Sequence, residues 1–222
     1  MPDYVTTRGK ILYLSDGTGE CGREWFHRTE HPDGTRTYRT VSEIDELPLL
    51  RDVTHTALAD FRPLECYARI RLGGEWSAAW FLFDDDHVTC EAQLAGMGRI
   101  TQRIAVPERA PYFGPHPVCG DAWVMASYDL GSPGRKAIDG FLSSKLVTGS
   151  DGPWIAPYTI DIDELPRETV EVLGGTFDTR HFRIFYDEAK QQDTWVTDDF
   201  HFVKLRNNEL AVECVLIEME QV

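Results

Sequence analysis

The stretch ETVEVLGGTFDTRHFRIFY, residues 168–186, decides the fold class, because it predicts two strands around a glycine pair. Residues 169–173 and 177–186 are rich in β-branched and aromatic residues, and Gly174-Gly175 supplies the positive φ angles that a tight turn favours. Three further runs, ending in one from Leu210 to Met219, follow the same pattern. Residues 168–222 therefore predict a set of antiparallel strands that close a barrel-like sheet.

The same alternation of strand-like runs and turn residues continues toward the N-terminus. Residues 20–28 and 36–44 flank a Pro-Asp-Gly turn at positions 32–34 and predict a hairpin. From residue 50 to 106 a turn follows each expected strand at about ten-residue intervals, which is typical of a β-meander. We expect one all-β domain over residues 1–222, an antiparallel up-and-down β-barrel or a strongly curved half-barrel with one or two short helices.

The middle of the chain, residues 107–157, differs from both ends. It is rich in proline and glycine. Residues 121–129 are helix-like, and residues 136–143 could form one further helical turn. Long excursions of this kind are uncommon and often functional. We expect a loop and short-helix insertion that lies over the barrel mouth and covers a cavity.

Residues 168–184, together with DTWVTD at 193–198 and VKL at 203–205, resemble a pattern of bacterial lipocalin-like and lipoprotein-carrier-like β-barrels. The resemblance is limited to the C-terminal strands. It implies a lipocalin-like architecture, a curved sheet around an apolar cavity, which is where barrels of this type hold a small molecule.

The composition of the chain excludes several classes of partner and cofactor. The formal net charge of −15 argues against nucleic acid and against an anionic membrane surface as partners. The first residues lack the pattern of a secretory signal, so we expect a cytoplasmic protein. The five cysteines are scattered without a CxxC pair, and the histidines form no HxH or HExxH motif. We expect buried thiols, no metal and no cofactor.

Candidate catalytic residues lie in the proline-rich middle. His116 has a proline on each side and aromatic residues nearby, and a histidine held in this way is a candidate general acid or base. Asp121 is expected to cap the following helix, and with Tyr128 and Asp129 it forms a second group of candidates. An equally simple interpretation is that His116 anchors its loop and that the aspartates only cap and solubilise the helix.

Candidate substrate-binding residues come from strand faces, where alternate residues share a side. Two arginine pairs on such faces suit a carboxylate or phosphate group, because a guanidinium binds these groups with two hydrogen bonds. The alternative is that both faces are solvated. The candidates are Tyr67, Arg69 and Arg71 on one strand, Arg99 and Arg103 on another, and the aromatic residues Trp80, Tyr112 and Trp123.

These residues predict a cofactor-independent lyase or isomerase that moves protons on a small, apolar, aromatic substrate inside the barrel. In this scheme His116 moves the proton, and Asp121 or Asp129 orients the histidine. Tyr128 donates a hydrogen bond to a developing oxyanion, and Arg69 or Arg103 holds an acidic group of the substrate. The alternative is a non-catalytic carrier or sensor of a small hydrophobic or aromatic ligand. A structural interaction module is the third hypothesis, and a homodimer is compatible with all three.

Overall fold

The computed structural model describes residues 4–16, 19–146, 148–186 and 191–222, and nearly all of its regular structure is strand. The first half of the chain contains β1 (Val5–Ser15), β2 (Gly19–Glu30), β3 (Arg36–Ile44), β4 (Leu49–Ala57), β5 (Pro63–Leu72), β6 (Glu75–Phe83), β7 (His87–Leu94) and β8 (Gly98–Ala105). The second half contains β9 (Phe113–Gly114), α1 (Val118–Met125), β10 (Lys136–Leu142), β11 (Ala156–Val172), β12 (Gly175–Phe185), β13 (Gln191–Val196), β14 (Phe202–Asn207) and β15 (Val212–Gln221).

All of these strands belong to one 15-stranded sheet, in the order β8-β7-β6-β5-β4-β3-β2-β1-β15-β14-β13-β12-β11-β10-β9. Two meanders meet at the antiparallel pair of β1 with β15, so the two ends of the chain hold the sheet together. Within the described residues the edge strands β8 and β9 do not pair with each other. The sheet is therefore a strongly curved open half-barrel, which is one of the two architectures that the sequence predicts.

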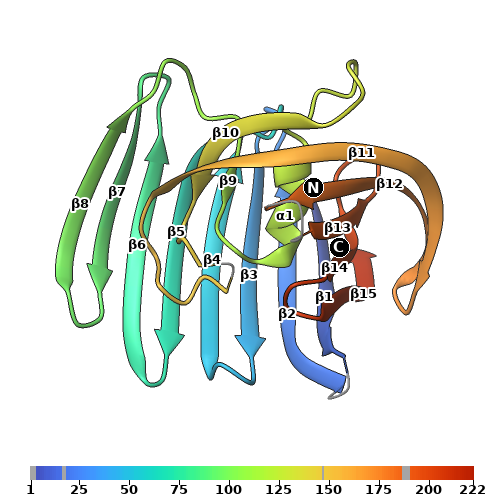
Figure 1. Cartoon of the computed structure of the whole chain (residues 1–222), viewed down its shortest axis with the longest axis horizontal. Helices are drawn as coiled ribbons and strands as arrows, with labels where there is room; N and C mark the ends of the chain where they lie inside the picture. Colours follow the sequence, from blue (N-terminus) through green and yellow to red (C-terminus); the bar gives the residue numbers. More distant parts are fainter. Residues whose placement is uncertain (1–3, 17–18, 147, 187–190) are drawn as a thin grey trace.

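The second half of the chain folds back over the first. Figure 1 shows β10 and β11 crossing in front of the broad layer formed by β3–β8. A side-chain amide helps to hold this arrangement, because Gln102 on β8 donates to the Ile155 carbonyl (3.0 Å) and accepts from the Ile155 amide (2.8 Å). The segment just before β11 is thus fastened to the edge strand β8 through the Gln102 side chain.

The helix α1 lies between the two halves and fills much of the interior. It contacts β13 and β14 on one side. On the other side Trp123 packs against Tyr38 and His55, with ring centroids 4.7 and 5.5 Å away. Burial of large aromatic side chains contributes strongly to core stability. The helix is therefore a wall of the core and not an external lid.

Two predicted helical stretches are corrected. Residues 136–142 form strand β10, paired with β11 from Lys136↔Ile162 to Leu142↔Ala156, because a partner strand supplies the backbone hydrogen bonds that local propensity does not specify. The helix spans Val118–Met125 instead of residues 121–129, and Pro117 is its N-cap residue. Asp121 is therefore in the first turn and does not cap the helix.

Gly120 permits the close contact between α1 and β3. A Cβ atom at this position would lie 3.0 Å from Tyr38 Cζ and even closer to the Tyr38 hydroxyl, and Tyr38 is buried. Glycine to alanine normally stabilises a helix by up to about 1 kcal/mol. We expect Gly120→Ala to destabilise the protein by about 1–3 kcal/mol, because overpacking outweighs that gain.

Urea unfolding of Gly120→Ala beside Gly131→Ala tests this expectation. Gly131 is exposed, has no positive φ, and a Cβ atom there would meet only the Asp129 carboxylate at 3.2 Å. A Gly120→Ala protein as stable as the wild type would show that α1 can move away from Tyr38 without cost.

Candidate functional site

A cavity of about 240 Å³ lies between α1 and the strands around it. Its wall comes from the N-terminal strands β1–β4, from α1, and from β10–β15, with further residues from the loop that follows β10. Most of the wall is apolar, as at Ile160, Ile184, Leu205 and Val212. A concave, mainly apolar space with a few polar groups is the usual form of a small-molecule site.

Glu24 on β2 fixes the helix end that faces this cavity. Its side chain is 0 % exposed, and its carboxylate accepts hydrogen bonds from the backbone amides of Val118 and Cys119, both at 3.0 Å, and from the Tyr13 hydroxyl at 2.6 Å. The N-cap residue of α1 makes no side-chain cap, so a carboxylate from a distant strand performs that role. Burial raises the pKa of Glu24 above its ordinary value, although these hydrogen bonds favour the ionised form.

Arg51 on β4 is a buried cation of the cavity wall, which also includes the exposed Lys145. Arg51 is 2 % exposed, its Nη2 donates to the Thr148 carbonyl at 2.7 Å, and its Nε atom is buried without a hydrogen-bond partner. Within the described residues no carboxylate oxygen lies within 4.0 Å of its guanidinium. Burial lowers the pKa of Arg51, and arginine still remains charged near neutral pH. A buried cation without an ion-pair partner destabilises the folded state, and an anionic ligand would offset that cost.

Asp121 on α1 is another titratable group that lines the cavity. Gln192 donates to its Oδ2 atom at 3.3 Å, and the Gln192 carbonyl oxygen accepts from the Tyr186 hydroxyl (3.1 Å) and from the Asn207 amide (3.2 Å). Burial, with the nearby charge of Glu24, raises the pKa of Asp121 to about 7. A carboxyl group with a pKa near neutrality can donate or accept a proton at physiological pH.

This pKa predicts a stability profile. The folded protein holds the Asp121 proton more tightly than the unfolded chain, whose carboxyl has the ordinary value of 3.8, so the free energy of unfolding should fall as pH rises from about 4 to about 7. At roughly 1.4 kcal/mol per pKa unit, we expect Asp121 to account for a loss of about 2 kcal/mol between about pH 5 and pH 7. Asp121→Asn, which cannot ionise, should remove that part of the slope.

Urea unfolding at a series of pH values measures the profile. Asp129→Asn is the matched control, because Asp129 is exposed and lies outside the cavity wall. Parallel profiles for wild type and Asp121→Asn would contradict the raised pKa.

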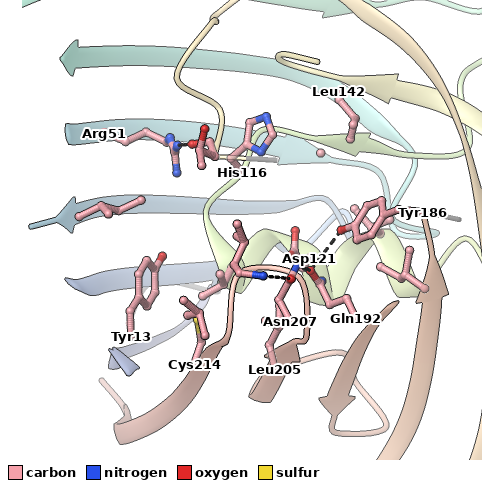
Figure 2. A pocket seen from close by; sticks show the side chains of 18 of the residues that line it. Tyr13, Arg51, His116, Asp121, Leu142, Tyr186, Gln192, Leu205, Asn207 and Cys214 are labelled. Carbon is pink, nitrogen blue, oxygen red and sulfur yellow. Dashed lines mark hydrogen bonds between the residues drawn. The ribbon is translucent and has the colours of Figure 1, made fainter. Parts of the chain in front are cut away.

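His116, which the sequence predicts as a catalytic residue, also lines the cavity. Its backbone has a φ of 77°, and its Nε2 atom lies 2.6 Å from the hydroxyl oxygen of Ser144, which donates to the Leu146 carbonyl at 2.9 Å. A Cβ atom at Gly149 would lie 2.7 Å from both the His116 ring and Arg51 Nη2. The loop after β10 therefore packs closely against both side chains and holds them at the cavity (Figure 2).

The other predicted site residues of the middle segment lie elsewhere. Tyr128 is buried and donates to the Gly134 carbonyl at 2.9 Å, while Asp129 is exposed and pairs with Lys136. Tyr112 is buried and donates to the Tyr158 carbonyl at 2.7 Å, and Trp123 belongs to the aromatic core. None of these four lines the cavity, because each is used by the local turn or by the core.

The predicted binding face on β5 and β6 is on the outside of the sheet. Tyr67 and Trp80 are 46 % and 47 % exposed, and the Arg69 and Arg71 guanidinium groups lie over the Trp76 ring. The reason is the strand alternation, which points the small apolar residues of β5 into the core.

The arginines of β8 follow the same rule. Arg99 and Arg103 are exposed, and Arg99 pairs with Glu91 at 3.1 Å. Neither contributes to the cavity wall. The solvated-face interpretation is correct for both strands.

The sequence hypothesis missed Glu24, Arg51 and Gln192, although a signal exists for the first two. Arg51 alternates with Leu49 and Val53, which are buried, and therefore occupies the apolar face of β4. Glu24 stands in the same relation to Phe26 on β2. A charged residue at an inward-facing position of a strand is unusual, and it indicates that polar partners lie inside the fold at that point.

One group of side chains has the composition of a metal site. Ligand-type atoms of Glu30, Asp199 and His201 lie within 4.8 Å of one another. Glu30 also pairs with Arg28 at 2.7 Å and lies 3.7 Å from Arg36. Because two arginines already neutralise Glu30, we assign the group to an ion-pair network. Among the described residues, no helix is long and apolar enough to cross a membrane.

Comparison with known proteins adds evidence on the fold. No protein-family model and no curated protein matches the chain. Among solved structures, a β-barrel-like protein of domain of unknown function DUF1849 from Brucella abortus is 11 % identical, covers 98 % of each chain and has a TM-score of 0.58. A DUF1089 family protein from Pseudomonas aeruginosa is 12 % identical over 81 % of this chain and 87 % of its own, with a TM-score of 0.50. The chain thus has a β-barrel-like fold that distant bacterial proteins share.

Proposed function

We propose that this protein binds a small apolar molecule with one acidic group in the cavity between α1 and the sheet, as a carrier or sensor. The observation that carries the proposal is Arg51, a buried cation on the cavity wall without a carboxylate partner among the described residues. A carboxylate of the ligand would satisfy the guanidinium and form charge-assisted hydrogen bonds.

The rest of the wall supports an apolar ligand body. The volume of about 240 Å³ lies below the range of drug-sized pockets and suits a small molecule. Use of the cavity for a ligand, as in the lipocalin-like carriers that the C-terminal motif resembles, is part of the same proposal. We also propose a cytoplasmic location, since the five cysteines are free thiols, which suits a reducing compartment.

The test compares ligands that differ only in the acidic group. Octanoic, decanoic and dodecanoic acids and the alcohols of equal chain length are titrated into the protein by isothermal calorimetry. We expect at least one acid to bind about tenfold more tightly than its alcohol, because hydrogen bonds to a charged group contribute about 1.5–3 kcal/mol. Equal affinity of acids and alcohols at every length would refute the role of Arg51.

A proton-transfer enzyme, of the lyase or isomerase type, is the second candidate. The observation that favours it is that Asp121, with a pKa of about 7, and His116 line the same cavity as the proposed anion-binding Arg51. A binding acid incubated with the protein in D₂O would then exchange C–H protons for deuterium, as seen by NMR. Exchange that is lost in both Asp121→Asn and His116→Ala would favour an enzyme, and absence of exchange with a tightly bound acid would favour the carrier.

A further inference from the structure

The cavity contains a second polar position, formed around Asp121. Gln192 is 4 % exposed and is held by the Tyr186 hydroxyl and the Asn207 amide, both of which donate to its carbonyl oxygen. The Gln192 amide is thereby oriented so that its nitrogen donates to Asp121 Oδ2. A polar group fixed by neighbouring hydrogen bonds is the usual form of a specificity determinant in an apolar pocket.

One atom of this arrangement is available to a ligand. In the described part of the chain Asp121 Oδ1 has no hydrogen-bond partner, and Asp121 belongs to the cavity wall. Figure 2 shows Arg51 on one side of the pocket, and Gln192, Asn207 and Tyr186 on the other. The cavity thus offers a cation on one side and a fixed carboxyl group on another, with apolar residues such as Ile160 and Leu205 in the wall.

We propose that Asp121 binds a hydroxyl group of the ligand, so that the preferred ligand is a hydroxy acid whose carboxylate contacts Arg51 and whose hydroxyl contacts Asp121. This inference rests on the proposed function, because it assigns the second end of the same ligand. In this arrangement an apolar chain or ring joins the two polar ends.

A hydroxyl fits Asp121 better than an ammonium group does. Gln192, which donates to Asp121, is neutral, as are Tyr186 and Asn207, which hold it, and the wall beyond them is mainly apolar. The nearby charge of Glu24 already accepts three hydrogen bonds from Tyr13 and the start of α1. Removal of an ammonium ion from water costs several kcal/mol, which a single carboxyl group with a pKa near neutrality does not offset. A hydroxyl both donates and accepts, so it can bind Asp121 in either protonation state.

The experiment uses three matched series at equal chain length: the octanoic, decanoic and dodecanoic acids, their ω-hydroxy forms and their ω-amino forms. The wild-type protein is titrated with each by isothermal calorimetry. At one length we expect the ω-hydroxy acid to bind about tenfold more tightly than the plain acid, as one hydrogen bond to a carboxyl group provides. The plain acid should in turn bind more tightly than the ω-amino acid.

Variants then locate the effect. Asp121→Leu should lose the tenfold preference, so that the ω-hydroxy acid binds this variant no more tightly than the plain acid of equal length. Asp129→Asn, an exposed aspartate outside the cavity, should keep the preference. Circular dichroism establishes whether each variant is folded. The titrations of the wild-type protein test the inference even if a variant does not fold.

The outcomes separate this inference from the proposed function. Plain acids that bind through Arg51, with no gain from a hydroxyl at any length, would overturn the inference and leave the proposed function intact. Tighter binding of the ω-amino series would also overturn it, in favour of a zwitterionic ligand. Failure of every acid to bind would overturn both.

Discussion

Arg51→Met is expected to remove the preference of the cavity for an acid. The substitution keeps an unbranched apolar side chain and removes the charge, so the affinity for the best alkanoic acid should fall about ten- to a hundredfold, the equivalent of about 1.5–3 kcal/mol. The affinity for the alcohol of equal length should stay within about twofold, because the apolar wall is unchanged. Calorimetric titration of both ligands measures the difference directly.

The matched control is Arg69→Met, the same substitution on the outer face of β5, where the arginine lies over Trp76 and is exposed. It should bind acid and alcohol as the wild type does. An equal loss of acid and alcohol affinity in Arg51→Met would mean that the residue supports the shape of the cavity and does not hold an anion.

Glu24→Ala is expected to cost about 3 kcal/mol of unfolding free energy, the largest stability effect that we predict. The change leaves the amides of Val118 and Cys119 and the Tyr13 hydroxyl without their acceptor in a buried position. Each unsatisfied buried polar group costs about 1–3 kcal/mol, partly offset here because a buried carboxylate is no longer desolvated. Urea unfolding monitored by tryptophan fluorescence measures the loss.

Two further variants separate the causes. Glu24→Gln keeps one acceptor oxygen and should lose about 1 kcal/mol. Glu43→Ala removes a half-buried carboxylate whose ion pair with Arg23 spans 3.3 Å, and should cost less than about 1 kcal/mol. A Glu24→Ala protein within about 1 kcal/mol of the wild type would show that water or a shift of α1 replaces the carboxylate.

The strand pattern of the chain was predictable because it depends on local features. The hairpin of β2 and β3 follows from the Pro-Asp-Gly turn, where Gly34 has a φ of 84°. The glycine pair after β11 likewise starts β12, and Gly175 has a φ of 135°. Such residues determine a turn whatever the rest of the chain does.

The helix boundaries and the strand β10 were not predictable in this way. The N-terminus of α1 is stabilised by Glu24, a residue 94 positions away from Val118 in the sequence. Strand β10 has little regular alternation of its own and is a strand because β11 pairs with it. In both cases a long-range partner decided the local structure, as is common where local propensity is weak.

For the candidate site, the sequence by itself indicated a segment that contributes to the cavity wall but not which side chains meet there. His116 and Asp121 were identified from a rigid loop and the helix that follows it, and both line the cavity. Arg51 and Gln192 come from β4 and β13, on opposite halves of the sheet. Only the fold brings them together, because the direction of a strand side chain changes with a one-residue shift in register, and that register is set by the curvature and pairing of the whole sheet.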